Sequence, residues 1–320
     1  MFHAILSRGY GFGVSDHRFL QEWLYAWPHG RKQVWFEREN DSFRFGDHLK
    51  GENKVAQSVT RPNGLFLSAA VQNRHEQLEP IFRWFRNIRC HNVPGSLGVE
   101  PTQSDMFVEY DENERPSRLR RFRELLTAAD VGIVDFKVQS DVPDHRSEPW
   151  QRGAHPRVFM QHKSSTPDAW LPLERESHGT QQLFRLAPLI IATLDAGAVL
   201  VVDELEASFH PLLALQIVQT FNDPKRNARK AQLVFSTHDT NLLGTMLGDP
   251  SLSRDQVWLT EKDQEGASVL YPLSDYKPRK EENLERGYLQ GRYGGIPFRR
   301  GLVRLRSRRA SRGTSRATLR

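Results

Sequence analysis

Two adjacent carboxylates and a distant imidazole carry the clearest chemistry in the sequence. Asp203 and Glu204 follow the apolar run AVLVV (198–202), and His238 ends the run AQLVFSTH (231–238). In an open parallel sheet, ligands bind beyond the carboxyl ends of the strands, so these runs would deliver all three groups to one edge. Asp203 can hold Mg²⁺ through water, because Mg²⁺ takes few carboxylates and keeps several waters. Glu204 can act as a general base toward an attacking water, and His238 can donate a hydrogen bond to a phosphate.

Each of these groups also has a simpler interpretation. A carboxylate pair after a strand can cap a helix or lie on the surface, and a lone histidine is most often structural. The order and spacing of all three favour a nucleotide triphosphate with its metal ion, because two neighbouring strands would bring them to the same edge.

A second candidate phosphate site is the stretch ESHGTQ (176–181). Ser177 and Gly179 stand at the start of a long helical pattern, where a hydroxyl and free backbone N–H groups meet the positive end of the helix dipole. The simpler interpretation is that Ser177 caps the helix. Taken alone, the stretch favours the cap.

The composition is that of a soluble globular protein, with 38% hydrophobic and 26% charged residues. The only cysteine, Cys90, excludes an internal disulfide and a CxxC zinc site. The most apolar stretch, 186–202, contains Pro188 and Asp195 and is shorter than the about 20 residues of a membrane span. The N-terminus lacks the apolar core of a signal peptide. We therefore expect a cytoplasmic protein with no membrane partner.

Positive charge is concentrated in the final segment, 299–320, which holds nine arginines and no acid. Removing these nine from the 45 basic residues leaves 36 against 39 acidic residues, so the rest of the chain is mildly acidic. We expect this segment to be disordered, because it cannot bury a core. It could bind nucleic acid by neutralising phosphates. An equally good explanation is a reading-frame accident or a broken gene.

The first 70 residues predict β-structure. The segments RKQVWFEREN (31–40) and DSFRFGD (41–47) predict two antiparallel strands joined at Asn40-Asp41. The run LFLSAA (65–70) suggests a buried strand, and the spacing of apolar residues predicts a helix over 75–89. A variable middle, 92–175, contains a predicted helix near 117–129.

From Ser177 onward the pattern alternates between helix and strand. A helical stripe runs to Leu194, and AVLVV reads as a strand buried on both faces. PLLALQIVQTF (211–221) opens with a proline suited to a first helical position, and AQLVFSTH reads as another buried strand. The order predicts an α/β protein with a parallel sheet.

Several segments of the sequence resemble those of a known family. ESHGTQ, VLVVDELEASFHP (199–211) and LVFSTHDTNLL (233–243) look like the second half of an ABC-type ATP-binding head of the SMC, RecF and OLD kind. More narrowly, the chain resembles the bacterial "AAA family ATPase" proteins of that group over 1–298. Three further segments share this likeness: WLYAWPHGRKQVWFER (23–38), LFLSAAVQNRHEQLEP (65–80) and GYLQGRYGGIPF (287–298).

The resemblance implies a P-loop NTPase fold of the ABC-type head, incomplete here, with an antiparallel β lobe and a helical lobe beside a mainly parallel sheet. Its parts would be 1–70 (β-rich lobe), 71–175 (helical, variable lobe), 176–298 (signature, Walker B and His-switch core) and 299–320 (tail). It further implies ATP binding and hydrolysis with ATP and Mg²⁺ as cofactors. The usual setting of such proteins is genome maintenance or defence against foreign DNA.

The family's functional residues carry over position by position. Asp203 matches the Walker B magnesium residue, Glu204 the catalytic base and His238 the switch histidine. The remaining matches are the signature residues Ser177, Gly179 and Thr180, the D-loop at 207–210 with Ser208, and Gln72 as the Q-loop glutamine. Signature and D-loop surfaces imply a homodimer, in which the signature of one subunit caps the ATP bound by the other.

One part of the family pattern is missing from these residues. The phosphate-binding loop GxxxxGK[ST] does not occur; the nearest segment, GDHLKGEN (46–53), has Glu52-Asn53 where lysine and Ser/Thr are required. A carboxylate there would repel phosphate, so this segment is rejected. We expect that the first portion of a longer protein is absent and that this polypeptide alone hydrolyses ATP weakly or not at all.

Two other functions stay open. The chain could be a non-catalytic remnant or an interaction module that keeps the dimer surface, with an effector protein as partner. It could also bind DNA through the arginine-rich segment. A nuclease is disfavoured, because no further acidic cluster that resembles a metal-dependent cleavage centre follows His238.

Overall fold

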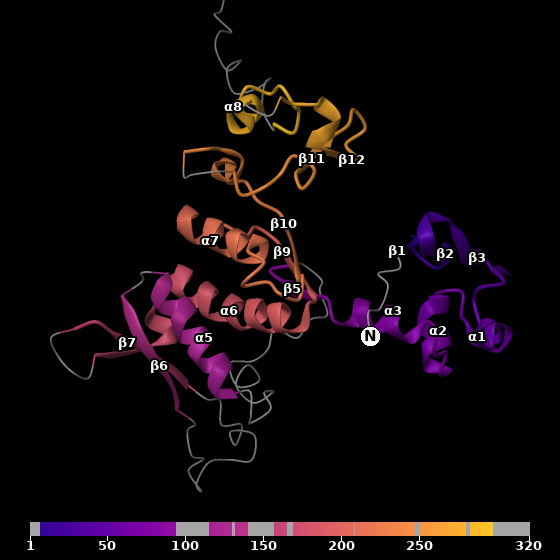
Figure 1. Ribbon diagram of the computed structural model, residues 1–320, viewed down its shortest axis with the longest axis horizontal. Helices are drawn as coiled ribbons and strands as arrows, with labels where there is room; N and C mark the ends of the chain where they lie inside the picture. Colours follow the sequence, from indigo (N-terminus) through magenta and orange to yellow (C-terminus); the bar gives the residue numbers. More distant parts are fainter. Residues whose placement is uncertain are drawn as a thin grey trace, which may run out of the picture. The chain divides into compact units, whose positions relative to one another are not determined.

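The structure, a computed structural model, describes residues 7–93, 115–129, 132–139, 157–164, 169–207, 209–246, 250–279 and 282–296 (Figure 1). The arginine-rich segment 299–320 lies outside these ranges. The chain divides into two compact units, Met1–Cys90 with Ala198–Val201, and His91–Gly197 with Val202–Arg320. We refer to them as unit 1 and unit 2.

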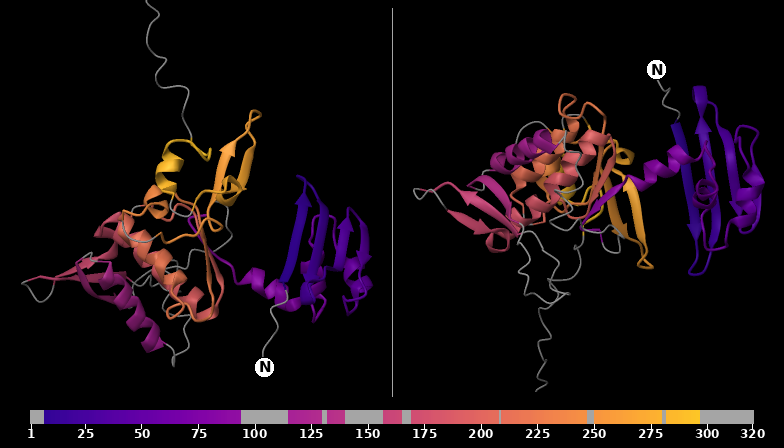
Figure 2. Two further views of the ribbon diagram at one scale, coloured as in Figure 1. Left: turned by 45° about the horizontal axis from the view of Figure 1, so that its top comes forward. Right: turned by 90° about the horizontal axis from the view of Figure 1, so that it is seen from below.

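Unit 1 is built on a four-stranded antiparallel sheet in the order β1-β2-β3-β4 (Figure 2). The strands are β1 (Ser7–Val14), β2 (Phe19–Trp27), β3 (Gln33–Glu39) and β4 (Ser42–Phe45), with a single-turn 3-10 helix, η1 (Pro28–Gly30), before β3. Glu39 pairs with Ser42, and Asn40 turns the chain with φ 53°, a conformation that asparagine tolerates. The predicted pair of antiparallel strands is confirmed.

Three short helices pack on this sheet: α1 (Asn53–Val59), α2 (Phe66–Gln72) and α3 (Glu79–Arg86). The expected strand at 65–70 is therefore wrong, because that run forms α2. A short apolar run has no periodicity that separates a strand from a buried helix. Here the carboxylate of Glu22 favours the helix. It accepts hydrogen bonds from the N–H groups of Phe66 and Leu67 at 2.6 and 3.0 Å and so caps the N-terminus of α2. The helix predicted over 75–89 is present in shortened form as α3.

His75 makes the stability of unit 1 depend on pH. Its ring is buried, and Nε2 lies 2.9 Å from Asn53 Oδ1, while Nδ1 has no hydrogen-bond partner among the described residues. Because an amide oxygen only accepts, Nε2 carries the proton and Nδ1 is bare. Burial lowers the pKa of His75 below its ordinary 6.5. Below about pH 6.5 the folded state thus binds fewer protons than the unfolded state. The contribution of His75 to stability is complete above pH 6.5, the pKa of an unfolded histidine, and decreases as the pH falls below it.

We expect the free energy of unfolding to fall between about pH 7.5 and pH 5 in the parent, and to fall less in His75→Phe. Denaturant titrations at several pH values measure this difference. His48→Gln, which changes an exposed histidine of the same unit, serves as the control. Identical pH dependence in the parent and His75→Phe would contradict the assignment.

Unit 2 has a helical layer and a small antiparallel sheet. The helices are α5 (Arg115–Ala128), α6 (His178–Ala196) and α7 (Pro211–Asn222), and the sheet has the order β6-β7-β8, from Ile133–Gln139, Arg157–His162 and Trp170–Pro172. Phe122 of α5, Phe136 of β6 and Phe184 of α6 meet edge-on in their shared core. The helices predicted near 117–129 and from 177 and 211 are confirmed.

A second sheet follows the order β10-β9-β5, from Gln232–Phe235, Val199–Val202 and Arg89–His91. The N–H of Ser236 donates to the carbonyl of Val202, and the carbonyl of Ser236 accepts the N–H of Leu205. Ser236 therefore bonds to residues on both sides of the position opposite it in the neighbouring segment. This is the pattern of parallel strands, and α7 makes the crossover between them. The strand at 199–202 is buried as predicted. The second strand is not, since Val234 is 54% exposed at the sheet edge.

The last part of unit 2 contains the hairpin β11 (Trp258–Lys262) and β12 (Ser268–Pro272) and the helix α8 (Leu284–Leu289). A small core of Val257, Leu259, Leu273, Leu284 and Tyr293 holds them together. The described part of unit 2 also contains three 3-10 helices: η3 (Leu173–Arg175), η4 (Thr240–Leu243) and η5 (Leu273–Tyr276). None of the helices in the described ranges is both long and apolar enough to cross a bilayer.

Candidate nucleotide site

Backbone hydrogen bonds bring the two predicted strand ends together. The N–H of Asp203 donates to the carbonyl of His91 at 3.1 Å, and the N–H of Leu205 donates to the carbonyl of Ser236 at 3.0 Å. Residues 203–205 therefore lie directly beside residue 236. The expectation that the Asp-Glu pair and the segment ending in His238 share one edge agrees with this geometry.

The hydroxyl of Ser236 connects the two acids. It donates to Asp203 Oδ1 at 2.5 Å and accepts the N–H of Glu204 at 2.8 Å. This holds the Asp203 carboxylate in one orientation while leaving it lone pairs for a cation. Sequence reasoning missed this role, because a serine thirty-three positions away carries no local sign that it touches Asp203.

Glu204 has an unfavourable backbone conformation. Its φ is +52°, in the left-handed region, which a residue with a long side chain rarely adopts. The turn is closed by the N–H of Ala207, which donates to the carbonyl of Glu204 at 2.8 Å. Arg74, Lys230 and Lys277 have the same left-handed conformation outside this site, so the strain at Glu204 does not by itself assign a function to its side chain.

We expect Glu204→Gly to stabilise the fold by about 1 kcal/mol, because glycine adopts the left-handed conformation without the cost of a Cβ. Chemical unfolding of the two proteins measures the difference. Glu204→Ala removes the same carboxylate but keeps the Cβ, so it should show no such gain. A loss of stability in Glu204→Gly would mean that the carboxylate itself supports the fold.

His238 joins the cluster through its backbone. Its N–H donates to Glu206 Oε1 at 2.6 Å, and the histidine itself is exposed. The other carboxylate oxygen of Glu206 is buried and has no partner in the described part of the chain. Glu206, like Ser236, was missed by sequence reasoning; its place two residues after Glu204 in DELE is the one available signal.

The donor set suits Mg²⁺ when water and phosphate complete its shell. Within the described residues, no group of three or more His, Cys, Asp or Glu side chains could hold a metal by itself. Mg²⁺ typically takes one or two carboxylates and fills its other positions with water and substrate phosphates. The carboxylate of Asp203 and the hydroxyl of Ser236 are oxygen ligands of that class.

The stretch ESHGTQ forms the start of α6, as the simpler interpretation predicted. Ser177 Oγ accepts the N–H of Thr180 at 3.1 Å, and the two hydroxyl groups lie 2.9 Å apart. Ser177 is therefore the N-cap of a 19-residue helix. Thr180 is 3% exposed, so its side chain is turned into the core. A role for Ser177, Gly179 and Thr180 in capping a partner's nucleotide stays a prediction.

The two remaining predicted site residues are Gln72 and Ser208. Gln72 is the last residue of α2 in unit 1 and is exposed, and it follows a helix and not the expected strand. Ser208 falls outside the described residues. Its neighbour His210 caps α7, because its Nδ1 accepts the N–H of Leu212 at 3.3 Å.

Residues 7–244 match the protein family described as "AAA domain, putative AbiEii toxin, Type IV TA system". The match covers more than half of the chain. The chain belongs to this AAA-domain family. Membership supports a P-loop ATPase fold and an ATPase-type nucleotide-binding function, and the site above lies within the matched residues.

Among solved structures, the AAA-domain chain is similar to the Smc head domain with an extended coiled coil bound to the C-terminal domain of ScpA from Pyrococcus furiosus. The identity is 14% and the TM-score 0.32, over 66% of this chain and 46% of that chain. The chain thus spans less than half the length of that neighbour. No curated protein matches it.

Proposed function

We propose that this AAA-domain protein binds Mg–ATP at the edge formed by residues 203–206 and 236–238, as the ATP-hydrolysing head of an ABC-type ATPase. The observation that carries the proposal is the hydrogen-bond chain from the N–H of Glu204 through the hydroxyl of Ser236 to the carboxylate of Asp203. It gives a fixed acid beside a strained one at the carboxyl ends of two parallel strands, where such sheets bind ligands.

The roles follow from the chemistry of each side chain. Asp203 would hold Mg²⁺, directly or through water, and the cation would neutralise phosphate charge. Glu204 would orient and deprotonate a water molecule. His238 would donate a hydrogen bond toward a phosphate oxygen. Gln72 and Ser208 would keep the Q-loop and D-loop roles that the resemblance implies.

The proposal includes a second copy of the chain. Ser177, Gly179 and Thr180 would cap the nucleotide of the partner subunit, and the segment 207–210 would cross the dimer interface. Genome maintenance or defence against foreign DNA is the proposed setting, which accords with the toxin–antitoxin wording of the family description. An effector protein or DNA would then be the further partner.

Hydrolysis by this polypeptide alone is expected to be weak. The 320 residues contain no GxxxxGK[ST] loop, which would supply the phosphate cradle, a lysine and one magnesium ligand. Asp203, Glu204 and His238 would then act on a loosely held triphosphate. We therefore expect measurable Mg–ATP binding with turnover close to background. Magnesium-dependent turnover that Glu204→Gln abolishes would contradict the expected impairment.

Calorimetric titration of the full chain with ATP, with Mg²⁺ and with EDTA, tests the binding. We expect Mg²⁺-dependent binding that weakens at least about tenfold in Asp203→Asn, because the cation loses its charged ligand. Asp275→Asn, which changes an exposed acid of η5, is the matched control. Binding that is independent of Mg²⁺ or of Asp203 would overturn the proposal. A stable dimer without any ATP binding would favour the interaction module.

A further inference from the structure

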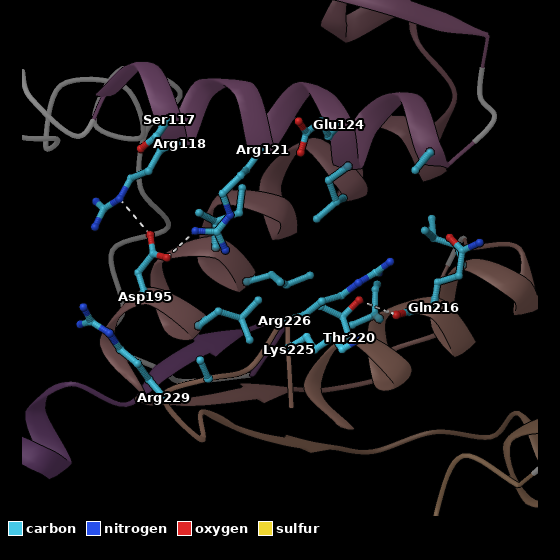
Figure 3. A pocket seen from close by; sticks show the side chains of 18 residues that line it. Ser117, Arg118, Arg121, Glu124, Asp195, Gln216, Thr220, Lys225, Arg226 and Arg229 are labelled. Carbon is cyan, nitrogen blue, oxygen red and sulfur yellow. Dashed lines mark hydrogen bonds and ion pairs between the residues drawn. The ribbon is translucent and has the colours of Figure 1, made fainter. Parts of the chain in front are cut away.

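A groove in unit 2 lies apart from the nucleotide site (Figure 3). It has a volume of about 800 Å³ and lies between α5, the second half of α6, α7 and the loop 223–229. None of the residues that line it belongs to the cluster at 203–206 and 236–238.

The floor of the groove is aliphatic. Leu125 comes from α5, Ile191 and Leu194 from α6, and Leu213 and Ile217 from α7. None of the described residues that line the groove is aromatic. A nucleobase usually stacks on an aromatic side chain, so this floor is better suited to an alkyl chain.

The rim is positively charged. Five basic residues line the groove against two acids, Glu124 and Asp195; they are Arg118, Arg121, Lys225, Arg226 and Arg229. Two of the arginines come from one wall, and the other three cations come from the opposite loop. A net positive rim around an apolar floor is complementary to a molecule with an anionic head and an apolar body.

Asp195 positions the two arginines of α5. Its carboxylate accepts from Arg118 Nε at 3.0 Å and from Arg121 Nη1, as the dashed lines in Figure 3 mark. One acid that accepts from two guanidinium groups holds both groups in a fixed orientation. Arg229 lies near the C-terminal end of α6, where Asp195 also lies. Its backbone packs against Gly197, because a Cβ added to Gly197 would lie 2.6 Å from the Arg229 carbonyl oxygen.

We propose that this groove binds an amphiphilic anion, an aliphatic chain that ends in a phosphate or a carboxylate. The anionic head contacts Arg121 and Arg229, and the chain covers the aliphatic floor. The competing explanation is purely structural: Asp195 joins α5 to α6, and the cations face the negative end of the α6 dipole. The two explanations differ in whether a ligand binds.

Octyl phosphate is the probe, titrated into the full chain by calorimetry. We expect saturable binding with one site, at least about tenfold tighter than inorganic phosphate or octanol, because the groove engages both ends of the ligand. Comparable binding of inorganic phosphate would show a plain anion site and overturn the proposal. So would comparable binding of octanol, which would show a neutral apolar pocket, or the absence of octyl phosphate binding.

Variants separate the groove from the general surface charge. Arg229→Gln removes a head contact and should weaken octyl phosphate about tenfold. Lys230→Gln removes the same charge one residue away, outside the lining, and should change the affinity less than about twofold. Ala128→Trp places a bulky ring in the groove and should abolish binding, with circular dichroism confirming the fold. Equal loss in Arg229→Gln and Lys230→Gln, or unchanged binding in Ala128→Trp, would overturn the assignment.

Discussion

Replacing Glu22 with leucine is expected to lower the free energy of unfolding of unit 1 by about 3–5 kcal/mol, a large share of the stability of a small domain. The Glu22 side chain is fully buried and accepts three hydrogen bonds, from the N–H groups of Phe66 and Leu67 and the hydroxyl of Tyr10. Its other neighbour is the buried guanidinium of Arg38, at 3.8 Å.

The size of the effect comes from what the substitution leaves behind. Without the carboxylate, two N–H groups at the start of α2 and the Tyr10 hydroxyl are buried without an acceptor. Arg38 would keep its bonds to backbone carbonyls, at 2.7 Å to Asn40 and 2.6 Å to Gly64, but its charge would have no counterion. Burial of the leucine side chain offsets only a small part of this loss of stability.

Chemical unfolding followed by tryptophan fluorescence measures the loss. Glu22→Gln keeps an acceptor oxygen, so it should lose less and remain measurable if Glu22→Leu does not fold. Glu37→Leu is the matched control on the neighbouring strand; Glu37 is only half-buried, bonded to the Tyr25 hydroxyl at 2.9 Å, and should cost about 1 kcal/mol or less. Equal losses at positions 22 and 37 would contradict the role of Glu22 as a buried cap.

The second large effect is expected at Ser236. Ser236→Ala should weaken Mg–ATP binding by about 10- to 100-fold, the usual consequence of removing a group that orients a metal ligand. The hydroxyl donates to Asp203 at 2.5 Å and accepts the N–H of Glu204 at 2.8 Å, so its loss frees the carboxylate to rotate and leaves the N–H of Glu204 without this acceptor. This prediction depends on the proposed function.

Calorimetry with Mg–ATP compares the parent with Ser236→Ala and Ser236→Thr. Threonine keeps the hydroxyl and should retain most of the affinity, which separates the lost hydrogen bond from a general disturbance of the strand end. Ser274→Ala, at an exposed serine of η5, is the control. If Ser236→Ala binds Mg–ATP within about threefold of the parent, Ser236 has no positioning role.

The sequence by itself determined the elements from Ser177 to Asn222 and the order in which they bring polar groups together. The stripe that begins at Ser177 is α6, Pro211 opens α7, and β9 ends at the Asp203-Glu204 pair. These features depend on residues a few positions apart, such as the Ser177 hydroxyl that caps its own helix at Thr180. Helical periodicity and capping depend on residues close together in the chain, so both can be recognised from the sequence alone.

Only the tertiary structure decided the rest. The segment 65–70 became helix α2 because an acid 44 residues earlier caps it, and β10 lies at a sheet edge with Val234 exposed. The hydroxyl of Ser236 reaches the 203–204 turn from 32 residues away, and Asp195 bonds to arginines more than 70 residues before it. Hydrogen bonds and ion pairs of this kind depend on distances in space, and no periodicity along the chain encodes which distant partners will meet.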